Sequence, residues 1–294
     1  MTGAPMVVAT VRRAGSGGLF TTAADGTCMD VTAVTGLPEV RAGDDLGAML
    51  AERLDPAAVD VVCVASTVVS KAEGRQADLT DFPASERAAA IAERIGAIAG
   101  EAKDPRFAQA VLDESEEVLL EAPILLAVTR FGHVTVNAGI DRSNVPDADL
   151  LLLPADPEAS ARRLREAVGV PVIVTDTSGR PFRTGQRGVA LGWADIPAAR
   201  DWRGERDRDG RELGVTVQAV VDELAGAANL VTGEGAGGTP AAAVGDFEFG
   251  DHDTRDTLFR DPENDLVRAA LREWTYGHRP DGVGGPNGGA DVRD

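Results

Sequence analysis

Residues 124–137 read I-L-L-A-V-T-R-F-G-H-V-T-V-N, two β-prone runs separated by a short turn that contains glycine. The pattern predicts strands at Ile124–Thr129 and His133–Asn137. The expected elements that follow are a strand at Leu150–Leu153, a helix at Pro157–Val168 and a strand at Val170–Thr175. Adjacent strands mixed with a crossover through a helix favour an α+β fold over a regular doubly wound sheet.

The rest of the chain adds helices and strands of similar length. The predicted elements are an edge hairpin within Thr2–Thr35, a helix capped by Asp44 or Asp45 and running through Leu54, a strand at Val59–Ala65, and helices at Ser85–Gly100, Pro105–Leu120 and Gln218–Leu230. Residues 200–211 form a charged loop. Beyond Tyr276 the chain holds mainly Gly, Pro, Asp and Asn, so we expect disorder there.

Composition narrows the classes of partner and compartment. The 294 residues carry a formal net charge of −19, which disfavours a nucleic-acid backbone as partner because the protein would repel it. Cys28 and Cys63 show neither CxxC nor zinc-ligand spacing, so we expect no structural zinc or disulfide framework. No apolar run is long enough for a signal segment or a membrane span. We therefore expect a cytoplasmic protein without membrane contact.

Acidic residues follow two apolar strands and one helix. Asp141 stands in N-A-G-I-D-R-S-N at 137–144, and Asp176 stands in V-I-V-T-D-T-S-G-R at 172–180. With Glu234 they would supply oxygen ligands for Mg²⁺ or Mn²⁺ bound together with a nucleotide. The alternative is that each residue alone caps a turn at the end of its element.

Two further features suggest a phosphate site. Lys71, one of only two lysines, follows a predicted buried strand and would contact a phosphate as a point charge; the alternative is a solvated loop lysine paired with Glu73. The glycine-rich residues 233–238 would cradle phosphates through their amides, or merely connect a helix to a strand. There is no Walker A pattern.

Several other polar residues carry no such signal. The histidines are scattered, so a hydrolytic triad is disfavoured. Asp222 and Glu223, and likewise Glu114, Glu116 and Glu117, have the pattern of solvated or capping residues on helices.

Taken together and in order, the motifs resemble the coenzyme F420-0:L-glutamate ligases, also called F420 gamma-glutamyl ligases. The matching stretches are G-L-P-E at 36–39, G-D-D-L at 43–46, V-S-K-A-E-G-R at 69–75, E-S-E at 114–116, 137–144, L-P-A-D-P at 153–157, 175–180, Asp207 with Gly210-Arg211, D-E-L-A at 222–225 and Gly233-Glu234. They extend over roughly residues 36 to 268.

The resemblance implies an activity and an architecture. It implies a GTP-dependent ligase that joins L-glutamate to the lactyl-phosphate-linked carboxylate of F420-0 and then adds further glutamates through gamma linkages, by way of an acyl phosphate. It also implies a homodimer, a mixed-sheet fold of two intertwined α+β subdomains, two divalent-metal sites (Mg²⁺ or Mn²⁺) and K⁺. The expected regions are a divergent N-terminal extension at 1–35, a catalytic domain at 36–276 and a disordered tail at 277–294.

The resemblance also assigns roles to residues. The implied catalytic residues are Asp141, Asp176 and Lys71, and the implied metal ligands are Asp141, Asp176, Thr177 and Glu234. The implied GTP contacts are Leu37, Pro38, Glu39, Val40, Ser66, Thr67, Lys71, Asn144, Thr232, Gly233, Gly235, Ala236, Gly237, Gly238 and Thr239. Either Arg180 or Arg183 would hold a substrate carboxylate or phosphate.

Two alternatives to this function stay open. The same fold would serve an amide ligase that acts on another carboxylate acceptor, and a catalytically silent nucleotide-binding protein would keep part of the site. Retention of Asp141 and Asp176 argues against the silent protein.

Overall fold

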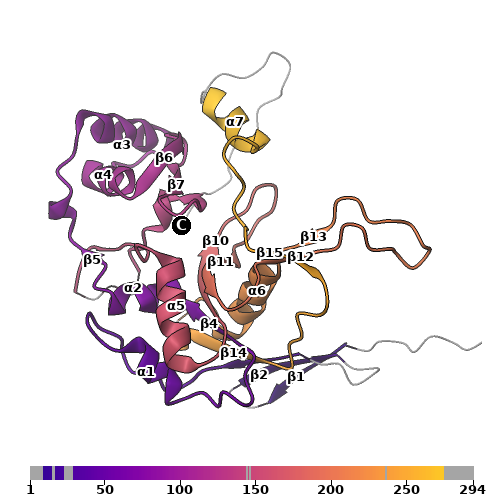
Figure 1. Cartoon of the computed structure of the whole chain (residues 1–294). Coiled ribbons are helices and arrows are strands. Elements are labelled where there is room, and N and C mark those ends of the chain that lie inside the picture. The colour runs from indigo at the N-terminus through magenta and orange to yellow at the C-terminus, as the bar shows by residue number, and fades with distance from the viewer. Residues whose placement is uncertain are drawn as a thin grey trace, which may run out of the picture.

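A mixed sheet is the central element of the computed structural model, which describes residues 9–14, 17–22, 29–143, 145, 147–235 and 237–274. Within these residues the sheet has the order β11-β10-β4-β14-β3 (Figure 1). Its strands are β3 (Asp30–Ala33), β4 (Val61–Ala65), β10 (Val172–Ser178), β11 (Arg187–Ala194) and β14 (Ala241–Gly245). Only β4 and β10 pair in parallel, so the expected α+β class with a mixed sheet is confirmed.

Helices cover both faces of this sheet. On one face Val62 and Val64 of β4 pack with α1 (Leu46–Ala51), α2 (Ser66–Ala72) and α5 (Pro157–Val168). On the other face Val61 and Cys63 pack with α6 (Val220–Thr232). Because successive side chains of a strand point to opposite faces, the apolar residues of β4 contribute alternately to the two cores.

Two glycines in β11 let helices approach the sheet closely. A Cβ added to Gly188 would lie 2.3 Å from the Ala225 carbonyl oxygen of α6, and one added to Gly192 would lie 2.4 Å from the Pro157 carbonyl carbon of α5. Glycine is therefore required sterically at both positions. Strand β11 is not among the predicted elements, because glycines inside a strand weaken its sequence signal.

A second core lies to one side of the sheet (Figure 1). It joins α3 (Glu86–Ala99) and α4 (Pro105–Asp113) to a three-stranded sheet. The strands are β6 (Ser115–Leu120), β7 (Leu126–Thr129) and β8 (Val134–Val136), in that order. The chain enters this region after β4 and α2 and returns to the main sheet through α5 and β10. The expected division into two intertwined α+β subdomains remains a prediction.

The helix predicted over residues 105–120 is wrong in its second half. Helix α4 ends at Asp113, and residues 115–120 form β6, which pairs antiparallel with β7. Pairing with β7, the next strand along the chain, thus overrides the helical pattern. Helix α3 matches its prediction: Ser85 caps its start by accepting a hydrogen bond from the Ala88 amide, and Gly100 ends it at φ +74°.

The remaining predictions differ in detail. Helix α1 has the expected cap at Asp45 but ends at Ala51, before Leu54. The predicted hairpin is present as β1 (Ala9–Ala14) and β2 (Gly17–Thr22), which pair antiparallel. The residues of the expected disordered tail lie outside the described residues. None of the described helices has the length and apolar character needed to cross a membrane.

Short elements complete the described chain. Strands β5 (Gln76–Ala77) and β9 (Leu150–Leu151) pair with each other. Strand β12 (Ala199–Asp201) pairs with β13 (Val217–Gln218) on one side and with β15 (Asp253–Arg255) on the other. The 3₁₀ turns are η1 (Leu79–Asp81) and η2 (Asn137–Gly139), and the last helix described is α7 (Leu266–Glu273). Helix α7 packs beside β6 rather than on the main sheet.

Candidate active site

A cavity of about 1340 Å³ gathers most of the predicted site residues. Those that line it are Leu37, Pro38, Glu39, Val40, Ser66, Thr67, Lys71, Asp141, Asp176, Thr177, Thr232, Gly233, Glu234, Gly235, Gly238 and Thr239. Gly237 is not part of the lining, and Asn144 and Ala236 lie outside the described residues. Residues far apart in the sequence therefore share one cavity.

Asp176 lines the cavity where the parallel strand β4 ends and β10 continues to Ser178. Ala65 at the end of β4 pairs with Thr175 of β10, so the next residues, Ser66 and Asp176, are neighbours. The Ser66 hydroxyl donates a 2.9 Å hydrogen bond to Asp176 Oδ1. The carboxyl ends of adjacent parallel strands are a common place for a binding site.

The pKa of Asp176 is raised to about 6. Burial is the main cause; the Ser66 hydrogen bond and the Thr177 amide oppose it, and the charges of Asp141 and Glu234 raise the pKa further. Three acidic residues that influence one another in this way form a site of concentrated negative potential. Such a site suits a cation.

Glu234 is held in place by two side chains. Its Oε1 accepts hydrogen bonds from the Thr177 hydroxyl at 3.0 Å and from Asn229 Nδ2 at 2.6 Å. Thr177 is on β10, and Asn229 is on α6. Asn229 is not among the predicted site residues; the one sequence signal for it is its position one helical turn before the glycine-rich loop.

Asp141 follows a strained turn. Asn137, Ala138 and Gly139 have φ values of +56°, +52° and +71°. Such values are costly for residues with a side chain, and they accumulate at functional sites. Asp141 itself is fixed by two backbone hydrogen bonds with Leu151, and its carboxylate accepts a hydrogen bond from the Ser143 hydroxyl at 2.8 Å.

Lys71 lies in a helix and is buried. It is part of α2, only 6% of its surface is exposed, and its Nζ lies 2.5 Å from Glu39 Oε1. The alternative of a solvated loop lysine paired with Glu73 is therefore wrong, since Glu73 instead contacts Ser160 and Arg163. Packing of α2 against the sheet directs the lysine into the cavity.

Three of the acidic residues predicted to be solvated or capping residues on helices form specific pairs. Asp222 accepts a 2.9 Å hydrogen bond from the Ala190 amide of β11. Glu114 accepts one from Arg75 at 2.5 Å, and Glu117 forms ion pairs with arginines of α7. Their partners lie far away in the sequence, so spacing along one helix gave no signal for them.

Of the two candidate arginines, Arg180 lines the cavity and Arg183 does not. Metal binding by carboxylates alone has less support: in the part of the chain that the structure describes, no three side chains of Asp, Glu, His or Cys lie together in a ready-made metal site. Any divalent ion would need ligands from outside that set, such as hydroxyl, phosphate or water oxygens.

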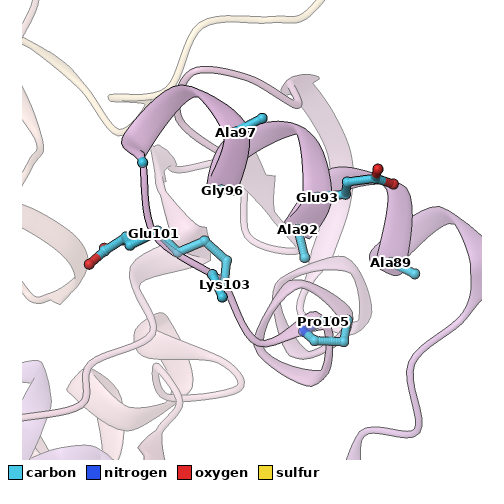
Figure 2. A pocket seen from close by; sticks show the side chains of 10 residues that line it. Ala89, Ala92, Glu93, Gly96, Ala97, Glu101, Lys103 and Pro105 are labelled. Carbon is cyan, nitrogen blue, oxygen red and sulfur yellow. The ribbon is translucent and has the colours of Figure 1, made fainter.

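A smaller hollow of about 540 Å³ lies between α3 and the segment that leads into α4 (Figure 2). Alanines and glycines supply much of its lining, and Glu93 points away from it in Figure 2. It brings no nucleophile or carboxylate cluster together. The larger cavity is therefore the candidate active site.

Comparison with known proteins agrees with the geometry. The family model for F420-0:gamma-glutamyl ligase matches residues 36–246. The chain belongs to this ligase family. The matched region contains each of the described polar groups that surround Asp176, whereas α7 lies beyond it.

The curated relatives extend the likeness over nearly their full length. A coenzyme F420:L-glutamate ligase of Natronomonas pharaonis is 71% identical over 252 residues, which cover 85% of this chain and 100% of the relative. The enzyme of the same name from Halorubrum lacusprofundi is 68% identical over 249 residues, with 84% and 99% covered. That from Archaeoglobus fulgidus is 46% identical over 250 residues, with 83% and 98% covered.

Proposed function

We propose that this chain is a GTP-dependent ligase that joins L-glutamate to the carboxylate of coenzyme F420-0 and then adds further glutamates through gamma linkages. The observation that carries the proposal is the cavity in which Asp141, Asp176, Glu234 and Lys71 meet, within a chain that belongs to the family. The relatives' shared name supplies the substrates.

The chemistry needs activation of a carboxylate. An acceptor carboxylate oxygen would attack the γ-phosphorus of GTP, and the bond to the β–γ bridging oxygen would break, which releases GDP and leaves an acyl phosphate. The α-amine of glutamate would then attack the acyl carbon, lose a proton and expel inorganic phosphate. Phosphoryl transfer of this kind is accelerated mainly by positioning and charge neutralisation.

Residues of this chain account for both requirements. In the structure the buried ammonium of Lys71 pairs with Glu39, whose side chain is 60% exposed. Because Glu39 is free to turn toward solvent, Lys71 would exchange it for the phosphate oxygens of the nucleotide. Backbone amides of residues 232–239 would hold the nucleotide phosphates. Arg180 would bind the carboxylate or phosphate of the acceptor.

The acidic end of the cavity fits a divalent cation. Burial and neighbouring carboxylates disfavour the charged form of Asp176, and a cation would offset that cost. Asp141, Asp176, Thr177 and Glu234 would hold two Mg²⁺ or Mn²⁺ ions, with nucleotide and water oxygens as further ligands. When bound, the ions supply positive charge to the phosphates. By resemblance the proposal also includes K⁺, a homodimer and a cytoplasmic location.

The experiment that tests the proposal measures GDP release by the purified protein with GTP and Mn²⁺. GDP formation that requires both F420-0 and L-glutamate would support it. GDP formation with a different carboxylate acceptor, and none with F420-0, would favour the alternative ligase. GTP binding without turnover for any acceptor would favour the silent nucleotide-binding protein.

A further inference from the structure

The cavity lining includes a group of apolar residues that the proposed phosphoryl-transfer chemistry does not use. We call it the apolar wall. Its residues are Ile124, Leu126 of β7, Val134 and Val136 of β8, and Val267 and Leu271 of α7. It belongs to the same cavity as Asp176 and Lys71.

The strands of the apolar wall have one packed face and one open face. Leu125 and Ala127 point into the core with α3 and α4. Leu126 has the opposite orientation and pairs with Val136 across β7 and β8. Val134 and Val136 remain 37% and 40% exposed, so the open face carries branched apolar side chains that the protein core does not use.

An ionic contact holds helix α7 against β6, beside the other strands of the wall. Glu117 on β6 accepts a 2.8 Å hydrogen bond from Arg268 Nε and also pairs with Arg272. The two guanidinium groups lower the pKa of Glu117 to about 2. Arg268 is the buried residue of the helix, whereas Val267 is 66% exposed although it lines the cavity.

The size and polarity of the cavity match a second substrate. Its volume of about 1340 Å³ exceeds the roughly 300–1,000 Å³ typical of a single small-molecule pocket. Its lining combines charged residues with the apolar wall, and Asp265 and Arg268 line the cavity beside Val267. By resemblance to the family, the acceptor F420-0 carries a flat aromatic deazaflavin ring in addition to its reacting carboxylate.

We propose that the apolar wall binds the aromatic ring of the acceptor and that Glu117, through Arg268 and Arg272, positions α7 to complete it. This inference rests on the proposed function. It assigns Val267 as a specificity residue and Glu117 as a positioning residue. A ring packed between branched side chains of β8 and α7 would direct the acceptor carboxylate toward Arg180 and Asp176.

The test compares Val267→Glu with the matched control Leu266→Glu. Both residues are exposed neighbours at the start of α7, and only Val267 lines the cavity. Val267→Glu should weaken F420-0 binding about tenfold, because a charge replaces apolar contact, while the KM for GTP stays unchanged. Leu266→Glu should change neither. Equilibrium dialysis with F420-0 and steady-state kinetics give the two readouts.

A second pair of variants examines the ionic contact. Glu117→Gln should raise the KM for F420-0 and leave the KM for GTP unchanged, because it frees α7. The adjacent exposed Glu116→Gln should have no effect. A rise in both KM values for Glu117→Gln would mean a general structural loss and would overturn its positioning role.

The outcomes separate the inference from the proposed function. If the Val267→Glu variant binds F420-0 with wild-type affinity, the inference is overturned. A changed oligomeric mass of this variant in light scattering would also overturn it, because a second copy of the chain would then cover the apolar wall. Failure of the proposed function would show as absence of glutamylated product from the wild-type protein. Dialysis does not depend on turnover and still tests the wall in that case.

Discussion

The Ser66 hydroxyl and Asp176 Oδ1 lie 2.9 Å apart, although the two residues are 110 positions apart in the sequence. The parallel pairing of β4 and β10 brings them together. This hydrogen bond orients the most deeply placed carboxylate of the cavity and stabilises its charged form. The site therefore depends on the register of two strands.

Ser66→Ala should reduce kcat about ten- to a hundredfold, because a hydrogen bond to a charged group contributes about 1.5–3 kcal/mol. The matched control is Ser70→Ala on the same helix, since the Ser70 hydroxyl is buried and has no hydrogen-bond partner among the described residues. Steady-state kinetics of both variants check the prediction. Equal activity of the two would contradict a role for the Ser66 contact.

Glu39→Gln should lower the melting temperature of the nucleotide-free protein. It leaves the buried Lys71 ammonium without its charged partner, and solvent around the 60% exposed Glu39 limits the size of the loss. GTP should restore part of the loss, because its phosphates would replace the carboxylate. Thermal melts with and without GTP measure both effects. A variant that melts like wild type without nucleotide would refute the account of Lys71.

Gly192→Ala should reduce the free energy of unfolding by about 2 kcal/mol or more, because the new methyl group would overlap the backbone of α5. Gly179→Ala is the control: nothing lies within 4 Å of its added Cβ, and its φ is not positive. Chemical denaturation of the two variants gives the comparison. Similar destabilisation by both substitutions would argue against the close contact between β11 and α5.

His133 should make the protein less stable as the pH falls from 6.5 to about 4. Burial lowers its pKa from 6.5 to about 4, so in this window the unfolded chain takes up a proton that the folded chain does not. The accumulated loss is on the order of 3 kcal/mol. The raised pKa of Asp176, about 6, has the opposite effect on stability as the pH falls. This effect is the same in wild type and in a His133 variant, so it cancels when the two are compared.

The measurement is the free energy of unfolding of wild type and of His133→Leu at several pH values. The difference between the two proteins should shrink or reverse as the pH falls through this window, because the leucine variant has no proton to take up. Parallel curves for the two proteins would show that His133 is charged or solvated in the fold.

The sequence predicted elements whose signals are local. The caps Ser85 and Gly100 defined α3, and the apolar run before Asp176 predicted β10. The five strands of the main sheet include one, β11, whose glycines are explained only by helices packed against them, so the sequence alone gave no reason for them. Residues 115–120 appeared helical because their apolar and acidic residues continue the helical spacing of α4, and pairing with β7 overrides that spacing.

For the candidate site, too, the sequence indicated the local motifs but not the tertiary contacts. Its carboxylates and Lys71 stood beside recognisable motifs, and the structure places them around one cavity. The contacts that position them were not predictable from spacing. Glu39 lies 32 residues from Lys71, and Glu117 lies 151 residues from Arg268. Such pairs are determined by tertiary packing.

The most direct measurement is mass spectrometry of F420-0 after incubation with the purified protein, L-glutamate, GTP and Mn²⁺, beside an Asp141→Asn variant. We expect mass gains in whole glutamyl units with the wild-type protein and none with the variant. Unchanged F420-0 in the wild-type reaction would contradict the proposed ligase, and equal gains in both reactions would contradict the role of Asp141.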